Sequence, residues 1–275
     1  MQKITSPDNQ RFKSAAKLLN SRGRKQQGKF LIDGVREFSR ARASDIRFAE
    51  IFLHEDRLDE ETIYQLQQED DAQLQDAICT LPAGLFNKIS FGDRNEGIVA
   101  VAHRPNTDLE VLDTNARDSQ ESLLVGVVES VEKPGNLGAV FRSADGAGLD
   151  AIIVANPLCD PFHPNSIRAS MGTVFSMKFA CTTSHRALEW LQQNSIQCFV
   201  TQVDADKSYF ECDYSSASAI IMGNEAHGLS PLWNQTTQPI AIPMQGIADS
   251  LNLSVSAALV FYEARRQRVS KNKTV

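Results

Sequence analysis

The sequence predicts an α/β protein built from two domains. Three observations support this: a length of 275 residues, short apolar segments that alternate with helical patterns, and a polar segment near the middle of the chain. A chain of this length exceeds the usual size of one domain, so two hydrophobic cores are expected. We place the first domain at residues 1–104, a linker at residues 105–121 and the second domain at residues 122–275.

The first domain is expected to begin with a basic helix and a basic loop. Ser6 and Pro7 fit an N-cap and a first helical position, and apolar residues then recur at helical spacing from Phe12 to Leu19. A loop is expected at Ser21–Gly28. Its cations are candidate contacts for the phosphates of a nucleic acid, and they are Arg22, Arg24 and Lys25.

The rest of the first domain predicts a small alternating unit. A strand at Phe30–Ile32 leads through the turn Asp33-Gly34 into a helix that contains Val35 and Phe38. Further strands are expected at Ala49–Leu53 and Gly97–Ala102, and further helices at Glu60–Gln68 and Gly84–Ile89. The segment that follows, Arg104–Glu121, is rich in Asp, Asn, Thr and Ser and therefore fits a linker.

The second domain predicts a parallel sheet. Its strand-like segments are continuous apolar runs, which are typical of strands covered on both faces. They lie at Leu124–Val128, Ala151–Val154, Cys198–Val203, Ala219–Met222 and Ile240–Ile242. Ligands of such sheets bind at the carboxyl ends of the strands, and three polar loops of this sequence follow there.

Composition and charge narrow the class of protein. No apolar run approaches the ~20 residues that cross a bilayer, and the N-terminus lacks the apolar stretch of a secretory signal, so a cytoplasmic protein is expected. The 5 cysteines are scattered, and no histidine has a partner at ligand spacing, which predicts neither disulfides nor a metal site. The net charge is −6, yet residues 1–40 are strongly basic, so a nucleic-acid partner stays open.

The three polar loops carry the candidate chemistry. In the first loop Asn136 is placed as a helix N-cap, and Arg142 follows on a helix whose other face is apolar. In the second loop Gly223 permits close approach of backbone to a ligand, and Glu225 is a candidate functional acid. The third loop leads into a long terminal helix that Ser250 or Asn252 can cap. Taken singly, each residue also fits an ordinary surface or capping position.

The three loops together form a specific pattern. Pro-Gly-Asn-x-Gly-x-x-x-Arg, Gly-Asn-Glu-x-x-Gly-Leu-Ser, and Ile-Pro-Met followed by Ser-Leu-Asn-x-Ser occur in this order within residues 123–268. This part of the chain resembles the SpoU (TrmH-type) branch of the SPOUT methyltransferases. The N-terminal part resembles the substrate-binding domain of that family, which is related to ribosomal RNA-binding proteins, although Asp33 replaces the more usual glutamate.

The resemblance implies a fold, a reaction and a set of site residues. It implies a SPOUT domain with a deep trefoil knot, an exception to the rule that chains do not thread themselves, and a homodimer. It implies transfer of a methyl group from S-adenosylmethionine (SAM) to a ribose 2′-hydroxyl of RNA, with large-subunit rRNA as first choice and tRNA as second. The implied cofactor contacts are Gly223, Ile242 and Leu251, and the implied catalytic residues are Asn136, Arg142, Glu225, Ser250 and Asn252.

The implied arginine raises a question of mechanism. The family proposal makes Arg142 the base, but a guanidinium stays protonated at neutral pH. We therefore interpret Arg142 as the group that orients the hydroxyl and stabilises developing negative charge. The sequence leaves open whether it acts within one subunit or across a dimer.

Two other classes of protein share features with this sequence. An NAD-dependent dehydrogenase also has a glycine-containing βαβ unit, but the glycines after Gly135 fall as G-x-x-G, and Ala151–Val154 is not followed by a ribose-binding acid. A non-catalytic RNA-binding or ribosome-assembly protein could keep the same fold. The intact set of candidate catalytic residues argues against that second alternative.

Overall fold

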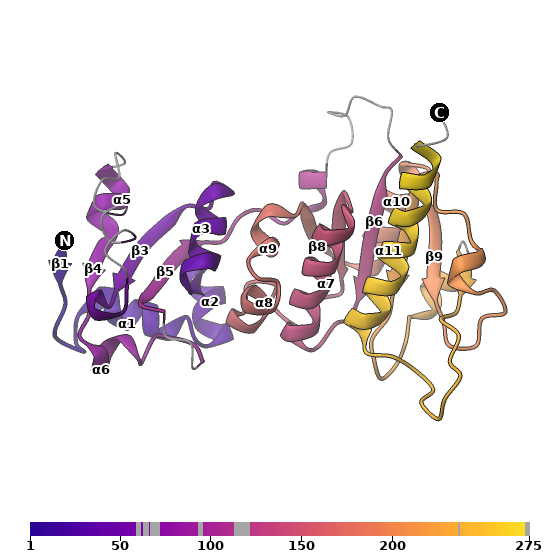
Figure 1. Ribbon diagram of the computed structural model, residues 1–275. Helices are drawn as coiled ribbons and strands as arrows, with labels where there is room; N and C mark the ends of the chain where they lie inside the picture. Colours follow the sequence, from indigo (N-terminus) through magenta and orange to yellow (C-terminus); the bar gives the residue numbers. More distant parts are fainter. Residues whose placement is uncertain are drawn as a thin grey trace. The chain divides into compact units, whose positions relative to one another are not determined.

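A computed structural model describes residues 1–58, 62, 66, 72–92, 96–112, 122–235 and 237–272. The chain forms two compact units, of which the first contains Met1–Pro105 with Asp160–Ser176, and the second contains Asn106–Cys159 with Met177–Val275. Each unit has its own sheet (Figure 1). The predicted α/β fold class is confirmed.

The first unit is built on a mixed five-stranded sheet in the order β1-β4-β3-β5-β2. Its strands are β1 (Gln2–Lys3), β2 (Lys29–Asp33), β3 (Phe48–Leu53), β4 (Ile78–Thr80) and β5 (Ile98–His103). The three strands predicted from the sequence are confirmed as β2, β3 and β5. The other two were not predicted, because two or three residues are too short to show a hydrophobic period.

The helices of the first unit correct the predicted N-cap of the first helix. They are α1 (Gln10–Lys17), α2 (Ser21–Gln27), α3 (Val35–Ala43), α5 (Ala72–Ala77) and α6 (Ala83–Phe86), with a 3₁₀ turn at Glu55–Arg57. The first helix is capped by Asn9, whose side chain accepts from the Arg11 amide at 2.9 Å, and not by Ser6. The helix predicted at Glu60–Gln68 lies largely outside the described residues.

Residues 21–27 form a helix and not the predicted loop. The glycine at position 23 allows close packing within this helix, because a Cβ there would lie 1.9 Å from the carbonyl oxygen of Lys17. The helix ends at Gly28, whose left-handed φ of 60° suits glycine.

A segment of the predicted second domain completes the first unit. Asp160–Ser176, which contains α8 (Pro164–Ala169) and α9 (Thr173–Ser176), leaves the second unit between two of its strands. The ring of Phe162 stacks on Phe30 of β2 with centroids 4.6 Å apart. This excursion supplies apolar cover for one face of the first sheet.

The second unit holds a six-stranded sheet in the order β11-β9-β10-β6-β7-β8, and every pair is parallel. Its strands are β6 (Leu124–Glu129), β7 (Ala151–Ala155), β8 (Phe179–Thr182), β9 (Gln197–Thr201), β10 (Ser218–Met222) and β11 (Gln238–Ile240). The parallel sheet and four of its strands were predicted, and the strand predicted at Ile240–Ile242 overlaps β11 only at Ile240. β8, which has only two buried residues, was not predicted.

Helices cover both faces of this sheet. α7 (Pro134–Ala147) and α11 (Leu253–Asn272) lie side by side (Figure 1), and α10 (Ser184–Gln193) joins the core cluster of the opposite face. Gly126 makes room for α11, since a Cβ there would lie 2.9 Å from the Phe261 ring. The remaining turns are 3₁₀ helices at Leu109–Leu112, Tyr209–Glu211 and Pro231–Gln235.

Two helix caps and the expected linker can be compared with the predictions. Asn252 caps α11 as predicted, with its Oδ1 3.0 Å from the Ser254 amide. Asn136 does not cap α7, because Pro134 takes the first helical position and Lys133 is the cap. Leu109 and Leu112 of the expected linker belong to the hydrophobic core, and residues 113–121 of that linker lie outside the described residues.

Candidate active site

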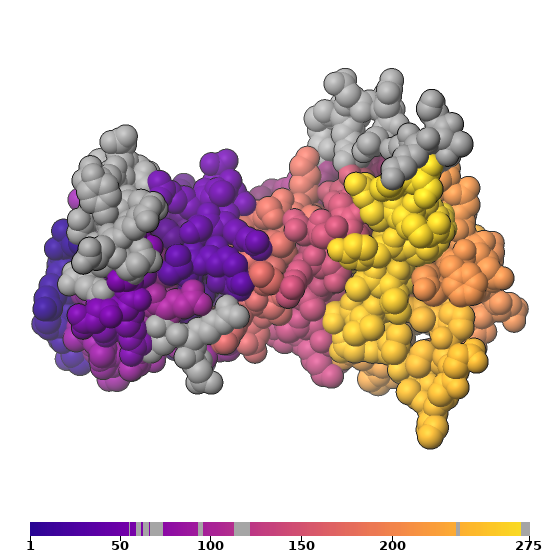
Figure 2. Space-filling view, in the orientation of Figure 1, coloured from indigo at the N-terminus to yellow at the C-terminus, as the bar shows by residue number. Residues whose placement is uncertain are grey.

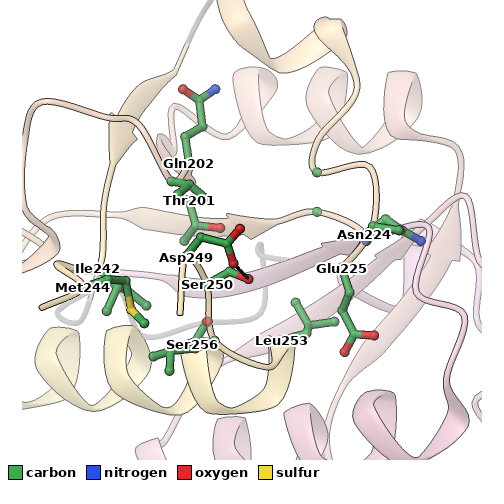
Figure 3. A pocket seen from close by; sticks show the side chains of 15 residues that line it. Thr201, Gln202, Asn224, Glu225, Ile242, Met244, Asp249, Ser250, Leu253 and Ser256 are labelled. Carbon is green, nitrogen blue, oxygen red and sulfur yellow. Dashed lines mark hydrogen bonds between the residues drawn. The ribbon is translucent and has the colours of Figure 1, made fainter. Parts of the chain in front are cut away.

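The main candidate site is a cavity of about 360 Å³ at the carboxyl ends of β9, β10 and β11 (Figure 3). Ile242 and Met244 lie on one side of it, and Asn224 and Glu225 on the other. The complete lining is Thr201, Gln202, Val203, Gly223, Asn224, Glu225, Ala226, Gly228, Ile242, Met244, Asp249, Ser250, Leu251, Leu253 and Ser256. This is the strand edge at which the sequence predicts ligand binding.

The loop after β10 is held by Asn224, a residue that the sequence analysis did not single out. Its Oδ1 accepts from the amides of Ala226 at 2.8 Å and His227 at 3.2 Å, while its Nδ2 donates to the Ser130 carbonyl at 2.8 Å. Asn224 and Gly228 also exchange backbone hydrogen bonds. Asn224 therefore folds the loop on itself and ties it to the end of β6.

The far end of the same loop is held by Glu129, which is buried at the end of β6. Its carboxylate accepts from the amide of Ser230 at 2.7 Å, from the Ser230 hydroxyl at 2.8 Å and from the Ser184 hydroxyl. Burial would raise the pKa of Glu129, but these hydrogen bonds outweigh it and hold the pKa below its usual value. In the sequence this acid only follows the predicted strand Leu124–Val128, so nothing pointed to its role.

Three predicted catalytic residues meet at the edge of the cavity. Glu225 Oε1 accepts hydrogen bonds from the side-chain amide of Asn136 and from Asn252 Nδ2, the latter at 3.2 Å. Asn252 Nδ2 also donates to Asn136 Oδ1 at 3.3 Å. Lys133 adds an ion pair, with its Nζ 3.1 Å from Glu225 Oε2. These residues come from three separate loops, so the fold assembles the cluster that their spacing could only suggest.

The other two predicted catalytic residues differ from each other in placement. Ser250 lines the cavity beside Asp249, with 3.5 Å between the Ser250 hydroxyl and Asp249 Oδ1 (Figure 3). Arg142 is exposed on α7 and does not line this cavity. The structure thus joins three of the five predicted residues by hydrogen bonds, places Ser250 in the same cavity as Glu225, and leaves Arg142 outside the lining of that cavity.

Of the three candidate RNA contacts, two are exposed and one is buried. Arg22 and Lys25 are exposed on α2. Arg24 is only 3% exposed, and its guanidinium donates to the carbonyls of Leu18 and Leu19 and to the Asp160 carboxylate. The structure therefore contradicts the prediction for Arg24, because its hydrogen-bonding groups are used inside the first unit.

The cavity has the chemistry that SAM requires. Its volume lies within the range of small-molecule pockets, roughly 300–1,000 Å³. Ile242, Met244 and Leu251 supply apolar surface for an adenosine, and Thr201 and Ser256 supply hydroxyl groups. All three predicted cofactor contacts line it. The segment after β11 projects from the surface of the second unit (gold in Figure 2) and carries the third loop.

Comparison with known proteins decides the family. The model of the SpoU rRNA methylase family matches residues 123–262, and that of the MRM3-like substrate-binding domain matches residues 9–100. The chain belongs to the SpoU rRNA methylase family. The family that the three loops predicted is confirmed, and the dehydrogenase alternative is wrong.

Relatives of this family match nearly the whole chain. A 23S rRNA (uridine(2479)-2′-O)-methyltransferase of Streptomyces viridochromogenes is 30% identical over 98% of this chain and 93% of its own. A crystal structure of an RNA 2′-O ribose methyltransferase is 37% identical, with a TM-score of 0.79 over 98% of this chain and 100% of that one. The SpoU methyltransferase AviRb of S. viridochromogenes in complex with AdoMet is 28% identical, with a TM-score of 0.83 over 95% and 100% of the two chains.

The described residues contain no group of three or more His, Cys, Asp and Glu side chains that could hold a metal ion. They also contain no helix that is long and apolar enough to cross a membrane.

Proposed function

We propose that this SpoU family member transfers the methyl group of SAM to a ribose 2′-hydroxyl of large-subunit rRNA in the cytoplasm. The observation that carries the proposal is the Glu225–Asn136–Asn252 cluster at the edge of the cavity. The first unit carries the RNA in this proposal, and the second unit carries the chemistry. Relatives named as 23S rRNA methyltransferases match nearly the whole chain, which supports the choice of rRNA.

The residues of this chain have separate tasks in that reaction. SAM supplies an electrophilic methyl group when bound. Gly223, Ile242 and Leu251 hold it, while the carboxylate of Glu225 and the amides beside it hold the ribose. Arg142 orients the 2′-hydroxyl and stabilises its developing charge, because a preorganised cation is most effective where charge appears.

Transfer of a labelled methyl group tests this function. Purified protein with SAM is expected to label 23S rRNA from a strain that lacks the protein, and the label should map to one ribose 2′-oxygen. tRNA and rRNA from a strain that has the protein serve as controls. Labelling of tRNA alone would reject rRNA as substrate, and SAM binding without any transfer would favour the non-catalytic RNA-binding alternative.

We also propose that the protein acts as a homodimer. Val255, Leu259 and Tyr262 are exposed on α11 and share one face, since they are spaced four and three residues apart. Tyr262 reaches α7, where a Cβ on Gly146 would lie 2.7 Å from its hydroxyl. Arg142 lies one helical turn before Gly146, on the same side of α7. We propose that a partner docks on this face and that Arg142 then acts in the partner's cavity.

The dimer proposal predicts complementation between two inactive variants. Arg142→Ala is expected to keep SAM binding and lose most of kcat, about 100-fold or more, because the guanidinium acts mainly in the transition state. Asn252→Ala is expected to be impaired because Glu225 loses the hydrogen bond from Asn252. Mixed dimers of the two variants should regain transfer, because one of their two sites is then intact. Activity measured on purified mixed dimers checks this, and no recovery would place Arg142 in its own subunit's site.

The exposed cations of α2 predict a salt-dependent loss of RNA binding. Arg22→Ala with Lys25→Ala should weaken RNA binding and lower the slope of log K against log salt by about 0.7–0.9 for each lost phosphate contact. Cofactor affinity should not change. Lys178→Ala with Arg186→Ala, two exposed cations of the second unit, is the matched control. Equal losses in the two double variants, in a binding series over several salt concentrations, would contradict a specific role for α2.

A further inference from the structure

A second, smaller cavity adjoins the candidate site and shares its acid. It has a volume of about 190 Å³ and is lined by Val131, Glu132, Lys133, Asn224, Glu225, Ala226 and Leu253. Four of these residues also line the larger cavity. Glu225 therefore stands at the boundary between the two spaces. The smaller space is below the roughly 300 Å³ at which pockets for whole small molecules begin, so it suits a fragment such as one sugar.

The position of the Glu225 carboxylate depends on both of its oxygens. Oε1 accepts from two side-chain amides, those of Asn136 and Asn252. Within the described residues, Oε2 pairs with Lys133, whose Nζ lies 3.1 Å away. Two contacts on one oxygen leave the carboxylate able to turn about that oxygen, whereas a third contact on the other oxygen fixes its plane. Lys133 supplies that third contact.

The backbone of Lys133 is itself well fixed. It is the residue that caps α7, and Pro134 after it restricts its conformation. Asn136 follows within the first turn of the same helix. One helix start thus presents a contact to each oxygen of Glu225, so a displacement of Lys133 would be felt at the carboxylate that Asn136 also holds.

We propose that Lys133 is a positioning residue for methyl transfer, which acts by holding the Glu225 carboxylate in the orientation that receives the acceptor ribose. This inference rests on the proposed function and assigns a role to a residue outside the predicted catalytic set. The lysine side chain is 69% exposed and that of Glu225 is 28% exposed. Such an exposed ion pair contributes little to fold stability, so its value lies in orientation.

A direct contact between Lys133 and an RNA phosphate is the competing interpretation. The charges of the smaller cavity disfavour it, because Glu132 and Glu225 place two carboxylates beside the one ammonium. The carboxylate of Glu132 accepts from Asn224 Nδ2 at 3.1 Å, so its partner there is a neutral amide. A phosphate there would approach more negative than positive charge, while ribose hydroxyls would find acceptors.

Kinetics of three variants test the proposal. Lys133→Met removes the charge and keeps the length, and it should lower kcat by roughly 10- to 100-fold, as expected when a catalytic group is misplaced. The KM for RNA, the Kd for SAM and the melting temperature should not change. Lys133→Arg should restore most of kcat, since a guanidinium can also pair with the carboxylate. Lys178→Met is the control for loss of an exposed lysine in the same unit.

A double variant shows whether Lys133 acts through Glu225. In a Glu225→Gln background, Lys133→Met should reduce kcat much less than it does in the wild type, because no carboxylate remains to be held. Full additivity, a rise in the KM for RNA at constant kcat with a lower salt slope, or no effect at all would each overturn the proposal. If Lys133→Met lowers the melting temperature, the kcat of Lys133→Arg decides instead. A wild-type protein that transfers no methyl group would reject the proposed function itself.

Discussion

Replacement of Gly223 with alanine is expected to weaken cofactor binding severely. A Cβ at this position would lie 2.3 Å from the carbonyl carbon of Gly228, 2.4 Å from its oxygen and 2.5 Å from the amide of Leu229. All three are backbone atoms, so no side chain can turn away to relieve the overlap. The loop must therefore shift, and it lines the cavity with Gly223, Glu225 and Gly228. Calorimetry with SAM is the measurement, and a loss of affinity of about 100-fold or more is expected, as for a site moved by an ångström.

Gly135→Ala is the matched control for this variant. Gly135 belongs to the first polar loop, and a Cβ there meets nothing within 4 Å. It should bind SAM as the wild type does and should keep its melting temperature. Normal SAM affinity in Gly223→Ala would contradict this prediction. It would mean that the loop can move away from the added Cβ without disturbing the cavity.

The sequence predicted the second unit well because its signals are local. Each central strand is a continuous apolar run, and the three loops carry their glycines, prolines and polar residues at fixed spacing. β8 was not predicted because only Phe179 and Ala180 of that strand are buried, which is too short an apolar run to indicate a strand. The N-cap at Asn136 was misplaced because a proline two residues earlier already occupies the first helical position.

The sequence predicted residues that line or border the cavity, but not the residues that hold the loop after β10 in place. Glu225 and Asn252 stood out through their motifs, and the structure brings them together. Glu129 and Asn224, which fix the loop, act through hydrogen bonds to residues about 90–100 positions away in the chain, such as Ser230 and Ser130. Contacts of that sequence separation leave no periodic trace, so no pattern in the sequence indicates them.

The same limit explains the error at Arg24. A basic run in a polar segment predicts solvent-exposed cations, and for Arg22 and Lys25 this is right. Arg24 is buried because Asp160, 136 residues later, comes to lie 2.8 Å from its Nε. A triple alanine variant of these cations would therefore mix a loss of RNA contacts with a loss of stability.

Arg24→Ala is expected to destabilise the first unit by about 3–5 kcal/mol, because it leaves a largely buried carboxylate without its main partner. Burial would raise the pKa of Asp160, but the hydrogen bond from Arg24 and the charge of Arg104 outweigh it and hold the pKa below its usual value. A lowered pKa in the folded state means that the ion pair stabilises the fold above about pH 3.9, the ordinary value for Asp, and that this is lost as the pH falls through the folded pKa. Urea unfolding should thus show a large difference between variant and wild type at pH 7 and a smaller one near pH 3. Arg22→Ala, on the exposed side of the same helix, should change stability by no more than about 0.5 kcal/mol. A difference that stays constant with pH would show that Arg24 acts through its bonds to the carbonyls of Leu18 and Leu19 and not through Asp160.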